Sequence, residues 1–176
     1  MTAKSYFSDF PVHREISKYL TGAYFFDCYQ RDVLTVQSSA LELCLGMLES
    51  TPRWVNFLME VRNRVVGWFG LKNLGSLNRH LTNKRQSKPA SSYRVGDKVG
   101  IFSLLYLSED EVILGDSDKH LDVRLSLCKN TNESGMSLKI ATVVHVHNSL
   151  GRAYMAVVAP VHKVIAPAML SRFEIQ

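Results

Sequence analysis

The order of its apolar segments constrains what this chain can fold into more than any other feature. A short strand-like segment at 23–29 comes first, and helical patterns follow it. Several strand-like segments joined by tight turns then lead to a long apolar helical pattern. Strands joined by tight turns pair antiparallel, because parallel neighbours need a much longer connection. The order therefore predicts an α+β fold: a curved antiparallel sheet of five to seven strands wrapped on a long C-terminal helix, with two shorter helices after the first strand.

Length and composition favour one folded unit. The chain has 176 residues, of which 46% are hydrophobic and 21% charged, as is ordinary for a soluble globular protein. We expect an N-terminal arm at 1–16 and a single domain at 17–176. The first residues lack the apolar run of a secretory signal, and no stretch reaches the ~18 uninterrupted apolar residues of a membrane span. Three cysteines without paired spacing are typical of reduced thiols, so we predict a cytoplasmic protein with no membrane span.

The net charge of +5 is concentrated in one connection. Seven basic residues and one acid lie between Lys72 and Lys98, so this segment carries the excess positive charge. Nucleic-acid-binding surfaces usually interleave basic and aromatic side chains, but residues 78–92 contain no Phe, Trp or Tyr, and we therefore predict no nucleic-acid partner. The Ser, Asn, Lys, Gly and Pro content of 73–92 predicts a mobile basic loop. It is open whether this loop is a lid, an interface or a disordered segment.

Two helices are predicted after the first strand. The polar triplet at 30–32 is expected to end that strand, and Ser38 and Ser39 are candidate N-caps for the apolar pattern that follows. Pro52 suits the first turn of a second helix at 52–71, whose aromatic stripe we expect in the core. The side chains expected to be largely buried are Trp54, Phe57, Trp68, Phe102, Leu104, Leu125, Ile140, Val144, Tyr154 and Val158.

The second half of the sequence predicts strands and then the closing helix. The main expected strands are Val99–Leu107, Glu111–Gly115, His120–Cys128 and Leu138–His147. The first of them is apolar on both faces, which is typical of a strand covered on both sides. Asn148 and Ser149 are candidate caps for the closing helix, and Pro160 and Pro167 should kink or divide that helix because each removes a backbone donor.

One polar constellation lies on the last two predicted strands. A hairpin that sets residue 128 opposite residue 137 brings His120 opposite His145, with Asp122 and His147 on the same face. Such groups can move protons or bind a metal, and His120, Asp122 and His145 are therefore the candidates for a catalytic site. The interpretation that we favour is the solvated outer face of a sheet, so no metal is predicted. No glycine-rich nucleotide motif, P-loop or zinc-protease motif occurs, so no cofactor is predicted.

Several spaced segments carry a resemblance to a known family, over most of residues 17–172. They are Gly22–Asp27, Pro52–Val55, Val95–Gly100, Lys119–Arg124 and His147–Tyr154. In them the chain resembles a bacterial family catalogued as a domain of unknown function, some members of which are fused to an NAD(P)-binding, sugar-epimerase-like domain. The family's element order is similar to that of the helix-grip superfamily of START-like, or SRPBCC, proteins. This resemblance implies an apolar cavity between the sheet and the C-terminal helix, and it carries over no catalytic residue.

The leading functional hypothesis is a non-enzymatic module that binds a small apolar or amphipathic ligand between the sheet and the last helix. The apolar positions on both faces of the strand 99–107, together with the aromatic helix at 52–71, motivate it. The residues expected to line the pocket are Phe102, Leu104, Tyr106, Tyr154, Met155 and Val158.

Two alternatives stay open. The first is a cyclase- or hydrolase-type enzyme in which His120 or His145 is the general base and Asp122 orients it. The second is an interaction subunit that works in trans with a nucleotide-binding partner through the basic segment 72–98. The oligomeric state also stays open, with a homodimer among the alternatives.

Overall fold

The computed structural model describes residues 6–33, 37–58, 60, 88–132 and 135–171, and these residues form one antiparallel sheet with helices on it. The strands are β1 (Tyr6–Phe7), β2 (Phe25–Val33), β3 (Lys98–Val99), β4 (Phe102–Leu107), β5 (Glu111–Ser117), β6 (Leu121–Asn132) and β7 (Gly135–Val146). Their order in the sheet is β1-β2-β7-β6-β5-β4-β3. The helices are η1 (Glu15–Tyr19), α1 (Ala40–Glu49), η2 (Ala90–Ser92) and α3 (Ser149–Leu170), and residues 53–58 are also helical. The predicted α+β class and antiparallel sheet are confirmed.

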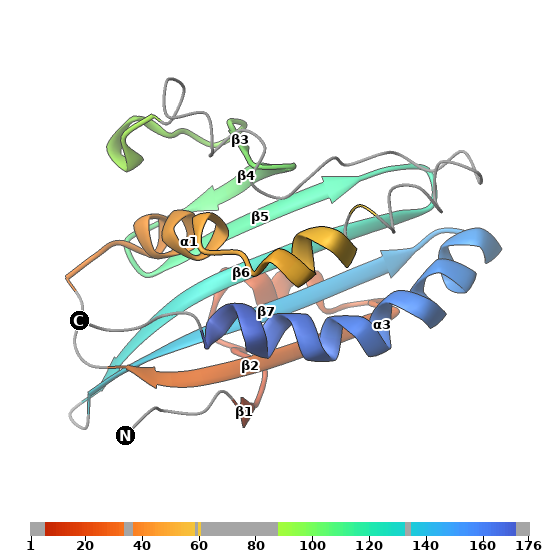
Figure 1. The fold of residues 1–176 in the computed structure, drawn as a ribbon, viewed down its shortest axis with the longest axis horizontal. Helices are drawn as coiled ribbons and strands as arrows, with labels where there is room; N and C mark the ends of the chain where they lie inside the picture. The colour runs from red at the N-terminus through yellow and green to blue at the C-terminus, as the bar shows by residue number, and fades with distance from the viewer. Residues whose placement is uncertain (1–5, 34–36, 59, 61–87, 133–134, 172–176) are drawn as a thin grey trace.

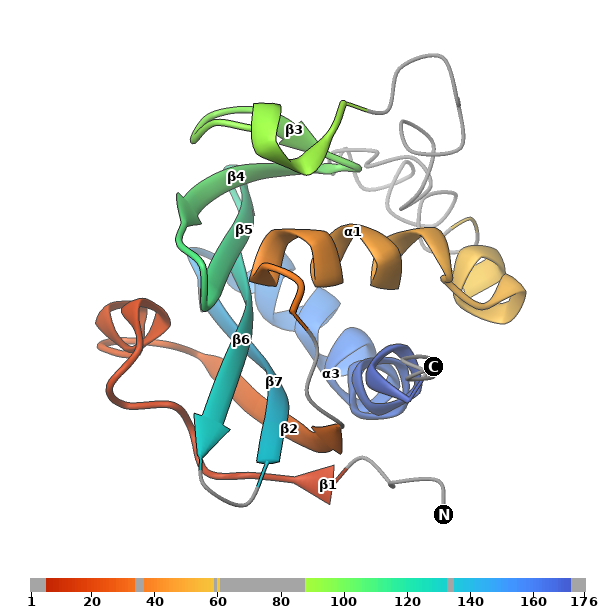
Figure 2. The same ribbon diagram turned by 90° about the vertical axis from the view of Figure 1, so that its left-hand side faces the viewer.

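The two faces of the sheet are covered by different parts of the chain. Helices α1 and α3 lie on one face, and the segment that contains η1 lies on the other (Figure 2). We call the first the helical face, whose core includes Leu104, Leu127 and Ile140. The second, the N-terminal face, has a smaller core around Ile16 and Val143. The expected N-terminal arm therefore packs on the sheet, since Ile16 is completely buried.

Strand β2 lies between β1 and β7 in the sheet and pairs with β7 along its whole length. Its nine residues pair in register from Phe25 opposite Val144 to Val33 opposite Met136 (Figure 1). The prediction that the polar triplet at 30–32 ends this strand is wrong. A strand presents alternate residues to opposite faces, so Arg31 enters the helical face while Asp32 stays exposed.

The hairpin of β6 and β7 is longer than predicted. The strands continue to Asn132 and Gly135, where an open polar loop was expected, and the pairing places Asp122 opposite His145. The predicted pairing of His120 with His145 is wrong by two residues. Because a shift of two preserves the alternation of side chains, the expected division of residues between the two faces still holds.

The predicted strand at Val99–Leu107 is two strands in the structure. Gly100 has a φ of +60°, a backbone conformation that glycine adopts easily, and the turn there sets Val99 opposite Phe102. A register shift between Leu104 and Tyr106 then changes the alternation within β4. As a result Leu104 lies in the helical-face core, whereas Tyr106 packs against the N-terminal face.

Helix α3 begins where sequence reasoning placed it and continues through both prolines. The Asn148 side chain accepts a hydrogen bond from the backbone N–H of Gly151, which caps the helix. A break was one of the two expected effects of Pro160 and Pro167, but the helix is continuous and changes direction along its length (Figure 1). Its contacts with β2 and β7 hold it on the helical face.

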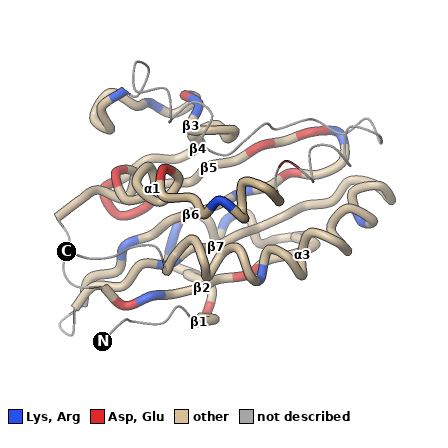
Figure 3. Tube along the Cα trace, in the orientation of Figure 1, with Lys and Arg blue, Asp and Glu red and all other residues tan. Residues whose placement is uncertain are grey.

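The outer side of α3 is apolar. By length and composition α3 is the one helix in the described part of the chain that could cross a membrane, with a mean hydropathy of 1.5 and 22% of its apolar window buried. Few charged residues lie along it (Figure 3), and Val157 and Val164 are among its exposed side chains. A helix packed on a sheet by one side meets the same criterion, so this property does not itself establish a membrane span.

The expected core residues divide between buried and exposed positions. Phe102, Leu104, Ile140 and Val144 are buried, and Leu125, Tyr154 and Val158 are half-buried. The prediction for the aromatic stripe is wrong at two positions, because Trp54 is 41% exposed and Phe57 is 63% exposed. Val55 is the buried residue of this turn, so the helix is rotated relative to the predicted stripe. Trp68 and residues 73–87 of the expected basic loop lie outside the described residues.

Candidate functional site

Three polar side chains meet on the helical face beneath α3. Asp27 on β2 is directly opposite Thr142 on β7 in the strand register, and His162 lies above them on α3. The Nδ1 atom of His162 is 2.9 Å from Oδ2 of Asp27, and its Nε2 atom is 3.4 Å from Oγ1 of Thr142. The three residues therefore form a continuous chain of hydroxyl, imidazole and carboxylate, which we call the polar trio.

The polar trio is buried in apolar surroundings. The side chain of Asp27 is 3% exposed and that of His162 is 21% exposed, and Thr142 is buried between Ile140 and Val144 on its strand. The ring of Phe25 meets the imidazole edge to face at a centroid distance of 6.0 Å. Polar groups are unfavourable in such a place unless they are paired.

One oxygen of the polar trio has no partner among the described residues. Oδ1 of Asp27 is buried and accepts no hydrogen bond from them, although Oδ2 of the same carboxylate is paired with His162. A buried carboxylate oxygen is expected to accept a hydrogen bond, and an exception calls for an explanation. The polar trio thus contains one unused acceptor within the described part of the chain.

The pairing also determines the chemistry of the imidazole. When Asp27 is ionised and the ring is neutral, Nδ1 donates to the carboxylate, which only accepts, and Nε2 accepts from Thr142. This order of groups is the one that activates hydroxyl nucleophiles in enzymes. Chemically, the polar trio can bind a donor or accept a proton at Nε2.

The three catalytic candidates taken from the sequence bond to different partners, although Asp122 lies directly opposite His145 in the strand register. His120 is buried, and its Nδ1 contacts the side chain of Asn148, the cap of α3. Nε2 of His145 lies 2.7 Å from the backbone oxygen of Tyr19, on the N-terminal face. Asp122 instead pairs with His147, with 3.3 Å between Oδ2 and Nε2. Among the described residues no group of three or more His, Cys, Asp or Glu side chains could hold a metal ion.

Asp122 keeps its charge through this pairing. Burial acts to raise the pKa of its carboxyl group, but the hydrogen bonds from Ser117 and His147 and the positive charge of Arg124 outweigh it, so that the pKa lies below its ordinary value. Asp122 and His147 thus form a partly exposed pair at the end of the β6–β7 hairpin, which is an ion pair when His147 is protonated.

The expected pocket residues lie on both faces of the sheet. Phe102 and Leu104 belong to the helical-face core. Met155 is a buried residue of α3, while Tyr154 and Val158 on the same helix are half-buried. Tyr106 is on the opposite face from Leu104, for the reason given above.

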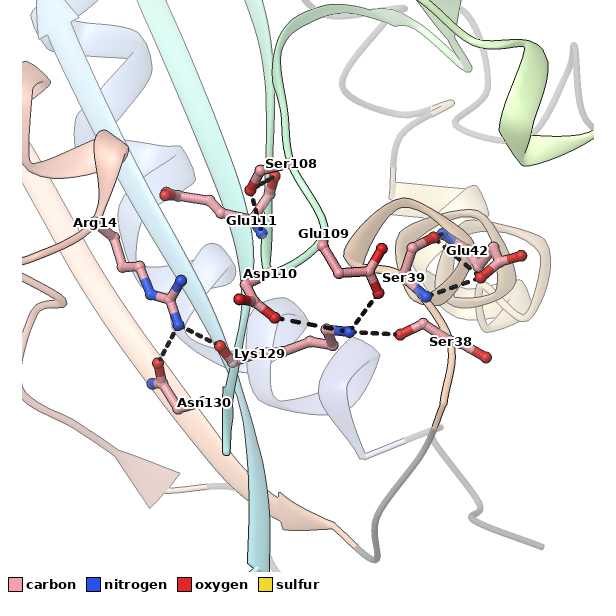
Figure 4. A network of polar contacts seen from close by, with 10 residues as sticks. All are labelled: Arg14, Ser38, Ser39, Glu42, Ser108, Glu109, Asp110, Glu111, Lys129 and Asn130. Atoms are coloured by element: carbon pink, nitrogen blue, oxygen red, sulfur yellow. Dashed lines mark hydrogen bonds and ion pairs between the residues drawn. The ribbon is translucent and has the colours of Figure 1, made fainter. Parts of the chain in front are cut away.

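A second polar network joins α1 to the sheet (Figure 4). Nζ of Lys129 donates to the backbone oxygen of Ser38 and to the carboxylate of Glu109, at 2.9 Å in both cases, and lies 3.8 Å from Asp110. From the other side Arg14 donates to the backbone oxygen of Lys129. This network ties the start of α1 to the β4–β5 turn.

Sequence reasoning did not select the polar trio. A signal was present, because Thr142 interrupts an inward-facing series of Ile and Val, and Asp27 occupies one position of an aromatic strand. Neither residue is informative alone, and His162 is 135 residues from Asp27 along the chain. Only the packing of α3 on β2 brings the three together.

Residues 19–169 match the family described as protein of unknown function (DUF2867). The chain belongs to the DUF2867 family. No curated protein and no solved structure matches the sequence. The DUF2867 match thus identifies the family and assigns no function.

Proposed function

We propose that this DUF2867 chain binds a small apolar or amphipathic molecule between α3 and the helical face of the sheet. The observation that carries the proposal is the unpartnered Oδ1 of Asp27, an acceptor buried in an otherwise apolar layer beneath a helix. A ligand with one donor group and an apolar body matches that environment, because the donor satisfies Asp27 and the body contacts residues such as Met155.

We also propose that the architecture is a helix-grip fold and that the START-like resemblance reflects a relationship. The topology supports this idea: the first long strand, β2, pairs with the last strand, β7, and the intervening strands form a meander. Helix α3 then returns across the face that these strands form (Figure 1). In such an arrangement the space beneath the closing helix is the natural site for a ligand.

The binding proposal can be tested with a neutral apolar fluorophore, N-phenyl-1-naphthylamine. We expect saturable binding with a blue-shifted emission, which Val158→Phe should weaken because residue 158 is half-buried on α3. Val157→Phe is the matched control, since its side chain is 70% exposed on the outer side of the same helix and should leave the affinity unchanged. Equal effects of the two substitutions, or no saturable binding by the unmodified protein, would contradict the proposal.

A second candidate function, ester hydrolysis, is favoured by the polar trio itself. In this reaction Nε2 of His162 would take the proton of the Thr142 hydroxyl as its oxygen bonds to the acyl carbon, and would return that proton to the leaving alkoxide. Nε2 would then take a proton from water as the water oxygen bonds to the acyl carbon, and would return it to Oγ1 of Thr142 as the acyl–Thr142 bond breaks and the acid leaves. Binding remains the better supported function, because Thr142 is buried and its oxygen is 3.4 Å from the base. Hydrolysis of p-nitrophenyl butyrate that is lost in His162→Gln and retained in His145→Gln would reverse this ranking.

A further inference from the structure

Arg31 is a second polar side chain on the helical face whose bonding is incomplete. It lies on β2, two positions after Tyr29 and four after Asp27, so all three point to the same face. Its side chain is nearly inaccessible, because the residue is only 5% exposed. The guanidinium reaches the C-terminal end of α3, where Nη1 donates to the backbone oxygen of Leu170 over 3.4 Å.

This one long hydrogen bond does not satisfy the group. A guanidinium carries five N–H donors, and Nε of Arg31 is buried without an acceptor. The carbonyl end of a helix attracts a cation, so Leu170 supplies a favourable but neutral partner. Among the described residues no carboxylate lies within ion-pair distance of Arg31, although a buried cation is unfavourable unless it is paired.

Lys129 is a buried cation on the same face whose hydrogen bonds and ion pairs are supplied by the protein itself. Lys129 is 7% exposed, which is close to the value for Arg31. Its ammonium group nevertheless meets the carboxylates of Glu109 and Asp110 and a backbone oxygen. The difference between two cations of equal burial indicates that the acceptor of Arg31 comes from outside the described residues.

We propose that Arg31 binds the carboxylate of an amphipathic monocarboxylic acid that lies beneath α3. This inference rests on the proposed ligand-binding function and names the class of ligand. A carboxylate matches the planar fork of the guanidinium with two parallel hydrogen bonds. A single negative charge is expected, because the one cation is accompanied on the same face by the Asp27 carboxylate, which would repel a dianion.

The placement of the two charged side chains gives the ligand an orientation. Arg31 and Asp27 are separated along β2 by about 13 Å at the backbone, at ~3.3 Å per residue. With its carboxylate on Arg31, the ligand extends from the C-terminal end of α3 toward His162. Its apolar chain then lies on the inward-facing residues of β7, among them Leu138 and Ile140. A donor at the far end of the molecule, such as a terminal hydroxyl, would then meet Oδ1 of Asp27 in the polar trio.

The test compares decanoate with 1-decanol, which share a chain and differ in charge. Displacement of N-phenyl-1-naphthylamine from the intact protein gives both dissociation constants. We expect decanoate to bind at least tenfold more tightly than 1-decanol. Arg31→Met should remove this preference by weakening decanoate at least tenfold while changing decanol less than twofold. Arg31→Lys should keep part of the preference, because it keeps the charge but loses the fork.

Arg124→Met is the matched control. Nε of Arg124 is also buried without a partner, but this residue lies on the N-terminal face, against the ring of Tyr19. It should change neither affinity. Circular dichroism of each variant shows whether it is folded, and if Arg31→Met is not, the wild-type preference and the Arg31→Lys variant decide the question.

The outcomes separate the two proposals. Equal binding of decanoate and decanol by the wild type, or a decanoate preference that survives in Arg31→Met, would overturn the role of Arg31 and leave it as a cap of α3. Binding of the fluorophore with no displacement by decanoate would also overturn it, while the general binding function stands. If neither the fluorophore nor the two amphiphiles bind, the binding function itself fails.

Discussion

The Asp27 carboxylate on β2 and the His162 imidazole on α3 are 2.9 Å apart and connect the first long strand to the last helix. Both side chains lie in an apolar layer, where burying a polar group costs more desolvation free energy than burying an apolar side chain. A polar pair in that place is therefore either a means of orienting α3 on the sheet or part of a site that needs polar chemistry. Measurements of stability and of binding distinguish these two roles.

Removing one partner of this pair should destabilise the protein. His162→Leu leaves the buried Asp27 carboxylate without its partner, and we expect a loss of about 3 kcal/mol in the free energy of unfolding. Adding Asp27→Val removes the stranded charge and should recover most of the loss, because a well-packed apolar pair usually matches a buried polar pair. Urea unfolding of the two variants and the wild type measures this. A double variant less stable than His162→Leu would show that the pair itself stabilises the fold.

Two helical glycines should respond in opposite ways to alanine. A Cβ on Gly151 would lie 2.5 Å from the backbone oxygen of His120 and 2.9 Å from Val146, so Gly151→Ala should destabilise the start of α3. A Cβ on Gly46, in α1, meets nothing within 4 Å, and Gly46→Ala should stabilise the protein by roughly 0.5–1 kcal/mol through helix propensity. Thermal unfolding of both variants checks the contrast. A rise in melting temperature for Gly151→Ala would contradict the close contact between α3 and the turn at 118–120.

Replacing the buried Lys129 should lower the free energy of unfolding far more than replacing the exposed Glu109, which belongs to the same network. Lys129→Met leaves the backbone oxygen of Ser38 without its donor, and we expect a loss of about 1–2 kcal/mol. Glu109→Gln should cost less than about 0.5 kcal/mol, because the Glu109 side chain is 70% exposed and its charge is screened by water. Denaturant unfolding at one pH measures both changes. Equal losses would indicate that the ion pair, rather than the hydrogen bond to Ser38, holds α1 in place.

The Asp122–His147 pair should add a pH dependence to stability. Since the pKa of Asp122 is lower in the folded protein, its contribution is present above the ordinary carboxyl pKa of about 4 and is lost as the pH falls through the folded value. Asp122→Asn should therefore destabilise the protein more at pH 6 than at pH 3. His147→Gln should reproduce part of this difference, because His147 is one of the groups that lower the pKa. The same loss for Asp122→Asn at both pH values would refute the assignment.

The elements could be predicted where a local pattern determines them. Ser39 caps α1 in a full capping box with Glu42, and Asn148 caps α3, as their position before an apolar helical pattern predicts. The alternation of β6 and β7 also predicted correctly which residues share a face. These features depend on residues within one or two turns of each other, so a single sequence contains the information.

Three errors, in the hairpin register, in the face of Tyr106 and in the burial of two aromatic side chains, concern relations between distant residues. The hairpin register differed by two because pairing along both strands decides it. Tyr106 was assigned to the wrong face because a bulge after Leu104 depends on the fit of β4 to β5. Trp54 and Phe57 were expected in the core because they belong to an apolar stripe, which indicates that one side of a helix prefers burial. The stripe does not show which surface the helix packs against, and both side chains are exposed.

The sequence by itself predicts the α+β class, the antiparallel meander and the long closing helix of this DUF2867 protein, because backbone preference and hydrophobic periodicity are local. The tertiary structure alone decided that Asp27, Thr142 and His162 meet, and that Arg31 lies buried beside the end of α3 without a carboxylate among the described residues. Each of these residues is ordinary in its own segment. Their significance arises from the loss of water around them when β2, β7 and α3 pack together, and desolvation is a property of the assembled fold.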